Sequence, residues 1–282
     1  RPALRYHGGK WMLAPWVISH FPEHRTYVEP YGGGGSVLLR KPRCHSEVYN
    51  DLWGRVVDVF KVLRCPNMAE CLRKRLELTP FAREEFEAIC EAALNQEADI
   101  IERARLTIFR SFAGFGSAST NGDFATGFRA NSSRSGTTPA HDWVNYPQNV
   151  SAFVDRLRGV VIEQRPAIAV MDQHDSSETL HYVDPPYPHE TRSMARGNAS
   201  YACEMTDADH IELADSLHAL TGMVIVSGYP CDLYDVELFP DWKRVTRKAL
   251  ADGARERTEV LWFNPAAAAR YQPAQADWID AA

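Results

Sequence analysis

Short apolar runs along the chain end repeatedly in glycine, proline or acidic residues. Such runs, bounded by turn residues, are typical of buried strands, and longer segments with helical spacing separate them. The pattern therefore predicts an α/β fold. The expected strands are residues 26–29, 47–49, 159–163, 180–183 and 223–226, with a terminal hairpin at 244–250 and 259–263.

Apolar residues at helical spacing fill much of the remaining sequence. Thr79 precedes Pro80, and proline is favoured at the first position of a helix. Thr206 is followed three residues later by Asp209, which is a capping-box pattern. Besides the helices that start after these two threonines, we expect helices at residues 10–21, 52–63 and 99–112.

Residues 113–147 have no helical period and are rich in glycine, serine, threonine and asparagine. A segment this long without regular structure is usually functional or disordered. Aromatic residues interleaved with arginines suit stacking on bases and contacts with phosphate or guanine edges. Packing of the aromatic rings on the core explains them equally well. The candidate DNA contacts are Arg110, Phe112, Phe115, Arg129 and Arg134.

The distribution of charge modifies this picture. A net charge of −6 argues mildly against a nucleic-acid binder, but net charge can hide a local patch. Residues 101–165 carry eight arginines against five acidic residues. A basic segment on an otherwise acidic chain is what contact with a DNA backbone requires.

The cysteines and histidines give no sign of a metal site. The six cysteines form no CxxC pair and have no zinc spacing, so we expect reduced thiols, no metal and a cytoplasmic location. No apolar run approaches the length of a membrane span. The chain begins at Arg1 without a methionine, so its natural N-terminus could lie further upstream.

The sequence Asp184-Pro185-Pro186-Tyr187 follows the expected strand at 180–183. Each proline fixes its own φ, and Pro185 also restricts Asp184 to an extended conformation. A carboxylate beside a flat ring suits a planar heterocycle with an exocyclic amino group. The ring stacks on such a ligand, and the carboxylate and a proline carbonyl accept its hydrogens.

A glycine-rich loop follows the first expected strand. Glu29, Pro30 and Tyr31 lead into glycines 32–35 and Ser36, giving the strand–loop–helix arrangement that cradles nucleotides in doubly wound folds. Asp51 ends the next strand, about where an acid would hold ribose hydroxyls.

Phosphate-binding motifs fit this loop poorly. Val37 occupies the position of the third glycine of a dinucleotide motif, and no Lys-Ser or Lys-Thr follows the glycines. An adenosine-containing ligand without phosphates is the better candidate, and S-adenosylmethionine is the common one.

Taken together, these motifs resemble those of Dam-like DNA adenine-N6 methyltransferases of the alpha group, phage and prophage members included. The cofactor motif comes first, a long insert follows, and the tetrapeptide comes late. The resemblance covers residues 5–265. Its motifs are Tyr6-His7-Gly8-Gly9-Lys10, Glu29-Pro30-Tyr31 with glycines 32–35 and Ser36, Asn50-Asp51 and Asp184-Pro185-Pro186-Tyr187, with further likeness at 201–210 and 257–265.

The resemblance implies a Rossmann-like class I methyltransferase fold with a mixed sheet. It also implies an inserted target-recognition domain that consists mostly of helices and loops. Residues 1–54 and 159–265 would form the catalytic domain, residues 55–158 the insert and residues 266–282 a tail. The partner would be double-stranded DNA. A homodimer is compatible with palindromic sites, although no dimer seam is visible in the sequence.

The resemblance also implies roles for individual residues. Asp184 and the Pro185 carbonyl would accept the amino hydrogens of an adenine flipped out of the duplex, with Pro186 stiffening the turn and Tyr187 stacking on the base. The residues that would bind S-adenosylmethionine are Tyr6, Lys10, Glu29, Pro30, Tyr31, Gly32, Gly34, Ser36, Asp51 and Asp184.

Two departures from the family pattern limit what carries over. Residues 110–116 stand where family members have a recognition hairpin with a different sequence, so the DNA target is not implied. Tyr31 replaces the more usual phenylalanine.

Three alternatives stay open. Cytosine-N4 enzymes more often have Ser, and glutamine-modifying protein methyltransferases more often have Asn, at the position of Asp184. A DNA-binding regulator with a vestigial cofactor site is the alternative from another class.

Overall fold

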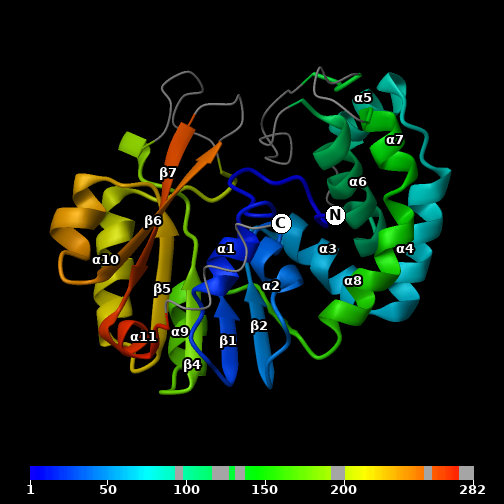
Figure 1. The fold of residues 1–282 in the computed structure, drawn as a ribbon. Coiled ribbons are helices and arrows are strands. Elements are labelled where there is room, and N and C mark those ends of the chain that lie inside the picture. Colours follow the sequence, from blue (N-terminus) through cyan, green and yellow to red (C-terminus); the bar gives the residue numbers. More distant parts are fainter. Residues whose placement is uncertain (93–97, 116–126, 131–136, 192–200, 251–255, 273–282) are drawn as a thin grey trace.

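The computed structural model describes residues 1–92, 98–115, 127–130, 137–191, 201–250 and 256–272. In these residues a seven-stranded sheet runs in the order β3-β2-β1-β4-β5-β7-β6 (Figure 1). Strands β1 to β5 pair in parallel, and β7 is antiparallel to both β5 and β6. The expected α/β class with a mixed sheet is confirmed. The strands are β1 (Thr26–Glu29), β2 (Ser46–Asn50), β3 (Val161–Glu163), β4 (Thr179–Val183), β5 (Met223–Gly228), β6 (Lys243–Leu250) and β7 (Glu256–Phe263).

Helices cover both faces of this sheet, and many of them start at a proline or a capping side chain. The α-helices are α1 (Ala14–Ser19), α2 (Ser36–Arg40), α3 (Gly54–Arg64), α4 (Pro66–Leu78), α5 (Arg83–Ala92), α6 (Ile100–Ala113), α7 (Pro139–Val144), α8 (Val150–Leu157), α9 (Ala167–His174), α10 (Asp207–Ala219) and α11 (Pro265–Arg270). Short 3-10 helices lie at Pro147–Asn149 and His189–Thr191, and a π-helix at Leu233–Leu238.

Alternating side chains of the central strands build two buried clusters, one on each face of the sheet. On β1, Tyr27 belongs to the cluster under α1, α2 and α3, and Val28 belongs to the cluster under α9 and α10. Burial on both faces is why apolar residues stand at successive positions in these strands, as in Tyr27-Val28 and Val48-Tyr49.

The chain reverses its direction of travel across the sheet between β1 and β4. From β1 it proceeds outward to β2 and β3, and later it returns to β4, which pairs with the other side of β1. Ligands of open α/β sheets bind outside the carboxyl ends of the strands at such a switch point. Glu29 ends β1, and Asp184 directly follows β4.

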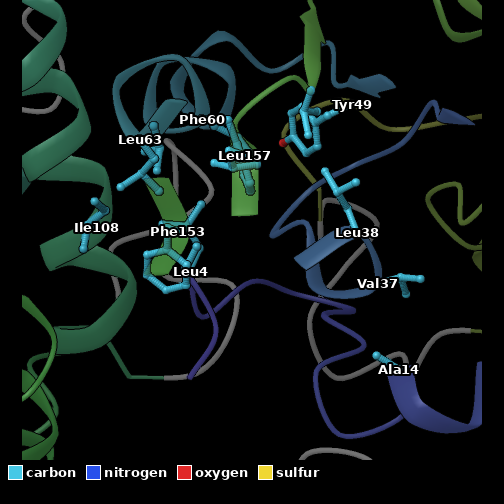
Figure 2. Packing of buried hydrophobic residues seen from close by; sticks show 14 of the residues in the cluster. Leu4, Ala14, Val37, Leu38, Tyr49, Phe60, Leu63, Ile108, Phe153 and Leu157 are labelled. Atoms are coloured by element: carbon cyan, nitrogen blue, oxygen red, sulfur yellow. The ribbon is translucent and has the colours of Figure 1, made fainter. Parts of the chain in front are cut away.

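The helices of the expected insert form a layer beside the sheet (Figure 1). This layer shares one hydrophobic cluster with the sheet and the N-terminal segment. Figure 2 shows Leu4 beside Phe153 of α8, with Ile108 of α6 close by and Tyr49 of β2 near Phe60 and Leu157. The division into catalytic and recognition domains remains a prediction.

Several expected elements are confirmed with small differences in their ends. The first strand has the expected bounds, and the terminal hairpin forms as β6 and β7. Thr206 accepts a hydrogen bond from the Asp209 N–H, and the Asp209 side chain accepts one from the Thr206 N–H, completing the capping box. The helix expected at residues 10–21 is shorter and spans only Ala14–Ser19.

The expectation that Thr79 caps a helix is wrong. Thr79 ends α4, where its hydroxyl donates to the Arg75 carbonyl at 2.8 Å, and the next helix, α5, begins only at Arg83. A residue before proline disfavours the helical conformation, so a Thr-Pro pair also suits the end of a helix.

Two segments in which no helix was expected contain helices. Within residues 113–147, α7 is capped by Thr138, which accepts from the His141 N–H at 3.2 Å, and its Trp143 is buried. The expected tail begins with α11, in which Asn264 caps the helix and Ala267 is buried. Residues 273–282 lie outside the described part of the chain.

Candidate active site

A cavity opens at the switch point, between the ends of β1 and β4. Its walls come from the N-terminal segment, the glycine loop, the end of β2, the turn after β4 and residues 201–205. The structure thus brings together sequence motifs that lie far apart in the chain. The predicted residues that line the cavity are Tyr6, Lys10, Glu29, Pro30, Tyr31, Gly32, Gly34, Ser36, Asp51, Asp184, Pro185 and Pro186.

The glycine loop passes so close to its neighbours that side chains would not fit. A Cβ at Gly32 would lie 2.2 Å from Cε2 of Tyr49. Gly33 and Gly35 have φ of +47° and +61°, a left-handed conformation that favours glycine. The Tyr49 hydroxyl donates to the Gly33 carbonyl at 2.7 Å and fixes the loop against β2.

Asp51 anchors the same loop from the end of β2. Its carboxylate accepts one hydrogen bond from the Gly33 N–H and one from the Trp53 N–H, both at 2.8 Å. Burial raises the pKa of Asp51, and the two N–H donors oppose that rise. The Tyr6 and Trp53 rings lie 6.3 Å apart in a tilted arrangement at this end of the cavity.

Lys10 and Asp184 form a buried ion pair in the cavity wall. The Lys10 ammonium lies 3.2 Å from Oδ1 of Asp184 and also donates to the Tyr187 hydroxyl. Burial by itself lowers the pKa of Lys10, but the carboxylates of Asp184 and Glu259 outweigh it and raise that pKa above its usual value. Lys10 therefore remains charged, and its positive charge stabilises the Asp184 carboxylate.

Glu259 of β7 is a member of this cluster that sequence reasoning missed. Its Oε2 lies 3.9 Å from the Lys10 ammonium, and its side chain is only 10% exposed. The signal was present, because Glu259 stands directly before the apolar run at 260–263, within the stretch that resembles the family. However, nothing in the sequence says that β7 lies next to β5 and so reaches the site.

Glu29 lies buried at the end of β1. Its Oε2 accepts from the Tyr27 hydroxyl at 2.7 Å and from the Leu38 N–H of α2 at 2.9 Å. Burial raises the pKa of Glu29 to about 8, although both hydrogen bonds act to lower it. The site therefore holds a carboxyl group that titrates near neutral pH.

Tyr187 does not line the cavity. Its side chain is 5% exposed, and its ring packs edge-on against Tyr229 with centroids 4.7 Å apart. The Lys10 ammonium lies 4.6 Å from the centre of the Tyr187 ring. In this structure the ring that was expected to stack on a base is covered.

The expected DNA contacts fall into two groups. Arg110 and Phe112 are buried in α6, and Phe112 packs edge-on against Tyr146. Phe115 is 68% exposed, and its N–H donates to the Gly127 carbonyl next to the antiparallel Gly114–Phe128 bridge. Arg129 lies on the other side of this bridge, where it is half-buried and its N–H donates to the Ala113 carbonyl. Arg134 lies outside the described residues.

Among the described residues, no group of His, Cys, Asp and Glu side chains has the arrangement of a metal site. No helix in the described part of the chain is long and apolar enough to cross a membrane.

Comparison with known proteins agrees with this geometry. The family model for D12 class N6 adenine-specific DNA methyltransferases matches residues 6–247, which include the glycine loop, Asp51 and the Asp184 turn. No curated protein matches the chain. The match covers most of the sequence, so the chain belongs to the D12 class of N6 adenine-specific DNA methyltransferases.

Proposed function

We propose that this enzyme transfers the methyl group of S-adenosylmethionine to N6 of an adenine that is flipped out of double-stranded DNA at a specific sequence. The observation that carries the proposal is the meeting of the glycine loop, Asp51 and Asp184 in one cavity. Family membership supplies the reaction, and the cavity suggests which residues perform it.

The cavity fits the cofactor chemically. Each Asp51 oxygen accepts one N–H and keeps a lone pair for a ribose hydroxyl. Tyr6 and Trp53 offer aromatic surface to an adenine ring. At the other end, Glu29 and Asp184 offer carboxyl groups to a cationic sulfonium. When bound, the cofactor supplies an electrophilic methyl group.

Asp184 would act on the target base. Its carboxylate accepts a hydrogen of the adenine amino group, the Pro185 carbonyl accepts the other, and the nitrogen lone pair is directed toward the methyl group. Alignment of this kind supplies much of the rate of a group transfer. The negative charge of Asp184 also stabilises the positive charge that develops on the nitrogen. The base must leave the duplex to reach this turn.

Tyr187 would change its surroundings when the base enters. Its ring is covered by Tyr229 and Lys10 in this structure, so stacking on adenine requires one of these contacts to open. The hydroxyl, bound by Lys10, keeps the ring near Asp184.

DNA would contact the exposed part of the insert. Phe115 is exposed just after the end of α6, Arg129 is half-buried close to the same helix end, and Arg134 follows later in the sequence. We assign Arg110 and Phe112 a supporting role, because both are buried beneath that surface.

The test is modification-detecting sequencing of DNA from a host that lacks adenine methylation and expresses this chain. We expect N6-methyladenine within one short sequence motif. With Asp184→Ala, we expect the rate of methyl transfer to fall by about a hundredfold or more. Asp184→Asn, which keeps the shape but not the charge, should be similarly impaired.

Each contrary outcome has a distinct meaning. N4-methylcytosine in place of N6-methyladenine would contradict the choice of base. An active Asp184→Ala enzyme would contradict the assigned role of Asp184. An unmodified genome together with measurable cofactor binding would indicate another substrate, and an absence of cofactor binding would indicate a vestigial site.

A further inference from the structure

The Lys10 ammonium lies between two buried carboxylates that come from different strands. Asp184 follows β4 and lies 3.2 Å away, and Glu259 on β7 lies 3.9 Å away. Glu259 points to the same face of β7 as Leu261 and Phe263, because side chains two residues apart share a face, and both of these residues are packed in the core. A charged side chain is rarely buried without a partner, and the Lys10 ammonium is one ion-pair partner of Glu259. Arg257 also acts on Glu259 and lowers the pKa of its carboxyl group.

The pairing of Lys10 with Asp184 conflicts with the proposed work of Asp184. During methyl transfer, positive charge develops on the adenine nitrogen beside this carboxylate. An ammonium on the same carboxylate repels that charge and reduces what Asp184 can contribute. The conflict is removed if the ammonium moves toward a second carboxylate when the base arrives.

We propose that Glu259 is a positioning residue that draws the Lys10 ammonium away from Asp184 when the target adenine occupies the site. The proposal rests on the proposed role of Asp184. The move is short, because Lys10 already lies between the two carboxylates.

Tyr187 is suited to guide this move. Its hydroxyl accepts from Lys10 and interacts with the carboxylates of both Asp184 and Glu259, since it lowers the pKa of each against the larger, opposing effect of burial. Lys10 also donates to the Gly8 carbonyl at 3.3 Å. The ammonium thus keeps two fixed contacts while its carboxylate partner changes.

The first experiment measures single-turnover methyl transfer by Glu259→Gln at saturating cofactor and DNA. We expect the rate to fall on the order of a hundredfold, while the dissociation constants for S-adenosylmethionine and DNA stay within about twofold. Glu259→Asp should recover part of the rate, because it restores the charge. Thr258→Val, the neighbouring substitution on β7, should leave the rate unchanged.

The second experiment tests whether Lys10 is the intermediary, using thermal unfolding. Glu259→Gln should lower the unfolding midpoint of the wild-type protein, because Lys10 loses a carboxylate. In a Lys10→Met background, the same Glu259→Gln substitution should raise the unfolding midpoint. Without the ammonium, the buried carboxylates of Asp184 and Glu259 repel each other, and the substitution removes that repulsion.

Two results would overturn the proposal. One is a Glu259→Gln rate within about threefold of wild type, since a charge that matters in the transition state costs more than that. The other is an equal change in unfolding midpoint with and without Lys10. Neither result depends on Asp184→Ala, whose residual activity tests the proposed function separately.

Discussion

Glu29 illustrates how one buried side chain links ligand binding to pH. Burial raises its pKa to about 8, so the free enzyme holds it mostly protonated at pH 7. A cationic ligand in the cavity that Glu29 lines favours the ionised carboxylate and lowers that pKa. Binding of the sulfonium cofactor should therefore release a proton.

This linkage gives a prediction for calorimetry in two buffers of different ionisation enthalpy. At pH 7, the wild-type enzyme should release between about half and one proton for each S-adenosylmethionine bound. Affinity should rise with pH up to the raised pKa, where release ends. Glu29→Gln should abolish the release, and S-adenosylhomocysteine, which lacks the sulfonium charge, should reduce it. Equal release by wild type and Glu29→Gln would contradict the linkage.

The glycine loop allows a comparison at the scale of an element. Gly35, at the start of α2, has φ of +61°, and a Cβ there would lie 2.6 Å from Cζ of Phe60 on α3. Gly159 has φ of +86°, and a Cβ there would meet nothing within 4 Å. Both glycines have positive φ, so the two alanine substitutions differ mainly in whether the new Cβ collides with a neighbouring side chain.

We predict that Gly159→Ala lowers the free energy of unfolding by about 1–2 kcal/mol, from backbone strain alone. Gly35→Ala should cost about 1–3 kcal/mol more, because Phe60 must move in a packed core. Only Gly35→Ala should also weaken cofactor binding, because it displaces the loop. Urea denaturation and cofactor titration of both variants measure these effects, and equal losses of stability would show that crowding at Phe60 is unimportant.

Short sequence patterns correctly predicted the helices and strands whose ends are determined by residues within or next to the element itself. The run that became β1, the Thr206–Asp209 capping box and the β6–β7 hairpin were all visible in the sequence. The Thr79-Pro80 pair led to the wrong prediction that a helix starts there, because the same pair can also follow the end of a helix. Pro66, at the start of α4, is a comparable signal, because proline favours the first position of a helix.

The candidate site was predictable only where its residues lie in motifs. Every residue expected to bind cofactor lines the cavity, because strand ends in a parallel sheet meet at one edge. Glu259 was not predictable, since it reaches Lys10 only through the antiparallel pairing of β7 with β5. The covered ring of Tyr187 likewise depends on Tyr229, which comes from a distant part of the chain.

At the scale of the whole molecule, positive charge is concentrated in one segment of an acidic chain, and the helices of that segment pack on the sheet. The chain as a whole is acidic, at −6, and repels a DNA backbone. Helices α6, α7 and α8, which lie within the basic segment at residues 101–165, belong to the helical layer, and that layer shares its core with the sheet. The shared core fixes the end of α6, next to the proposed DNA contacts Phe115 and Arg129, relative to the sheet, and a defined position of this kind is what site-specific methylation requires.

This arrangement predicts that Arg129 and Arg73 contribute differently to DNA binding, although each carries one positive charge. Arg129 is half-buried opposite the last residue of α6, whereas Arg73 of α4 is paired with Glu70 and Glu77. Helix α4 lies on the outer side of the helical layer (Figure 1). If Arg129 neutralises a phosphate, Arg129→Ala should reduce the dependence of log Kd on log salt by about 1. Cofactor affinity should not change.

Arg73→Ala is the matched control, because it removes the same charge from a surface whose own acids already balance it. Its salt dependence should equal that of wild type, as measured by fluorescence anisotropy across a salt series. An equal decrease in salt dependence in both variants would mean that DNA binding depends on the overall charge of the enzyme. A decrease in salt dependence that is confined to Arg129→Ala would instead place the duplex over the end of α6. The exposed ring of Phe115 would then be available to contact the bases.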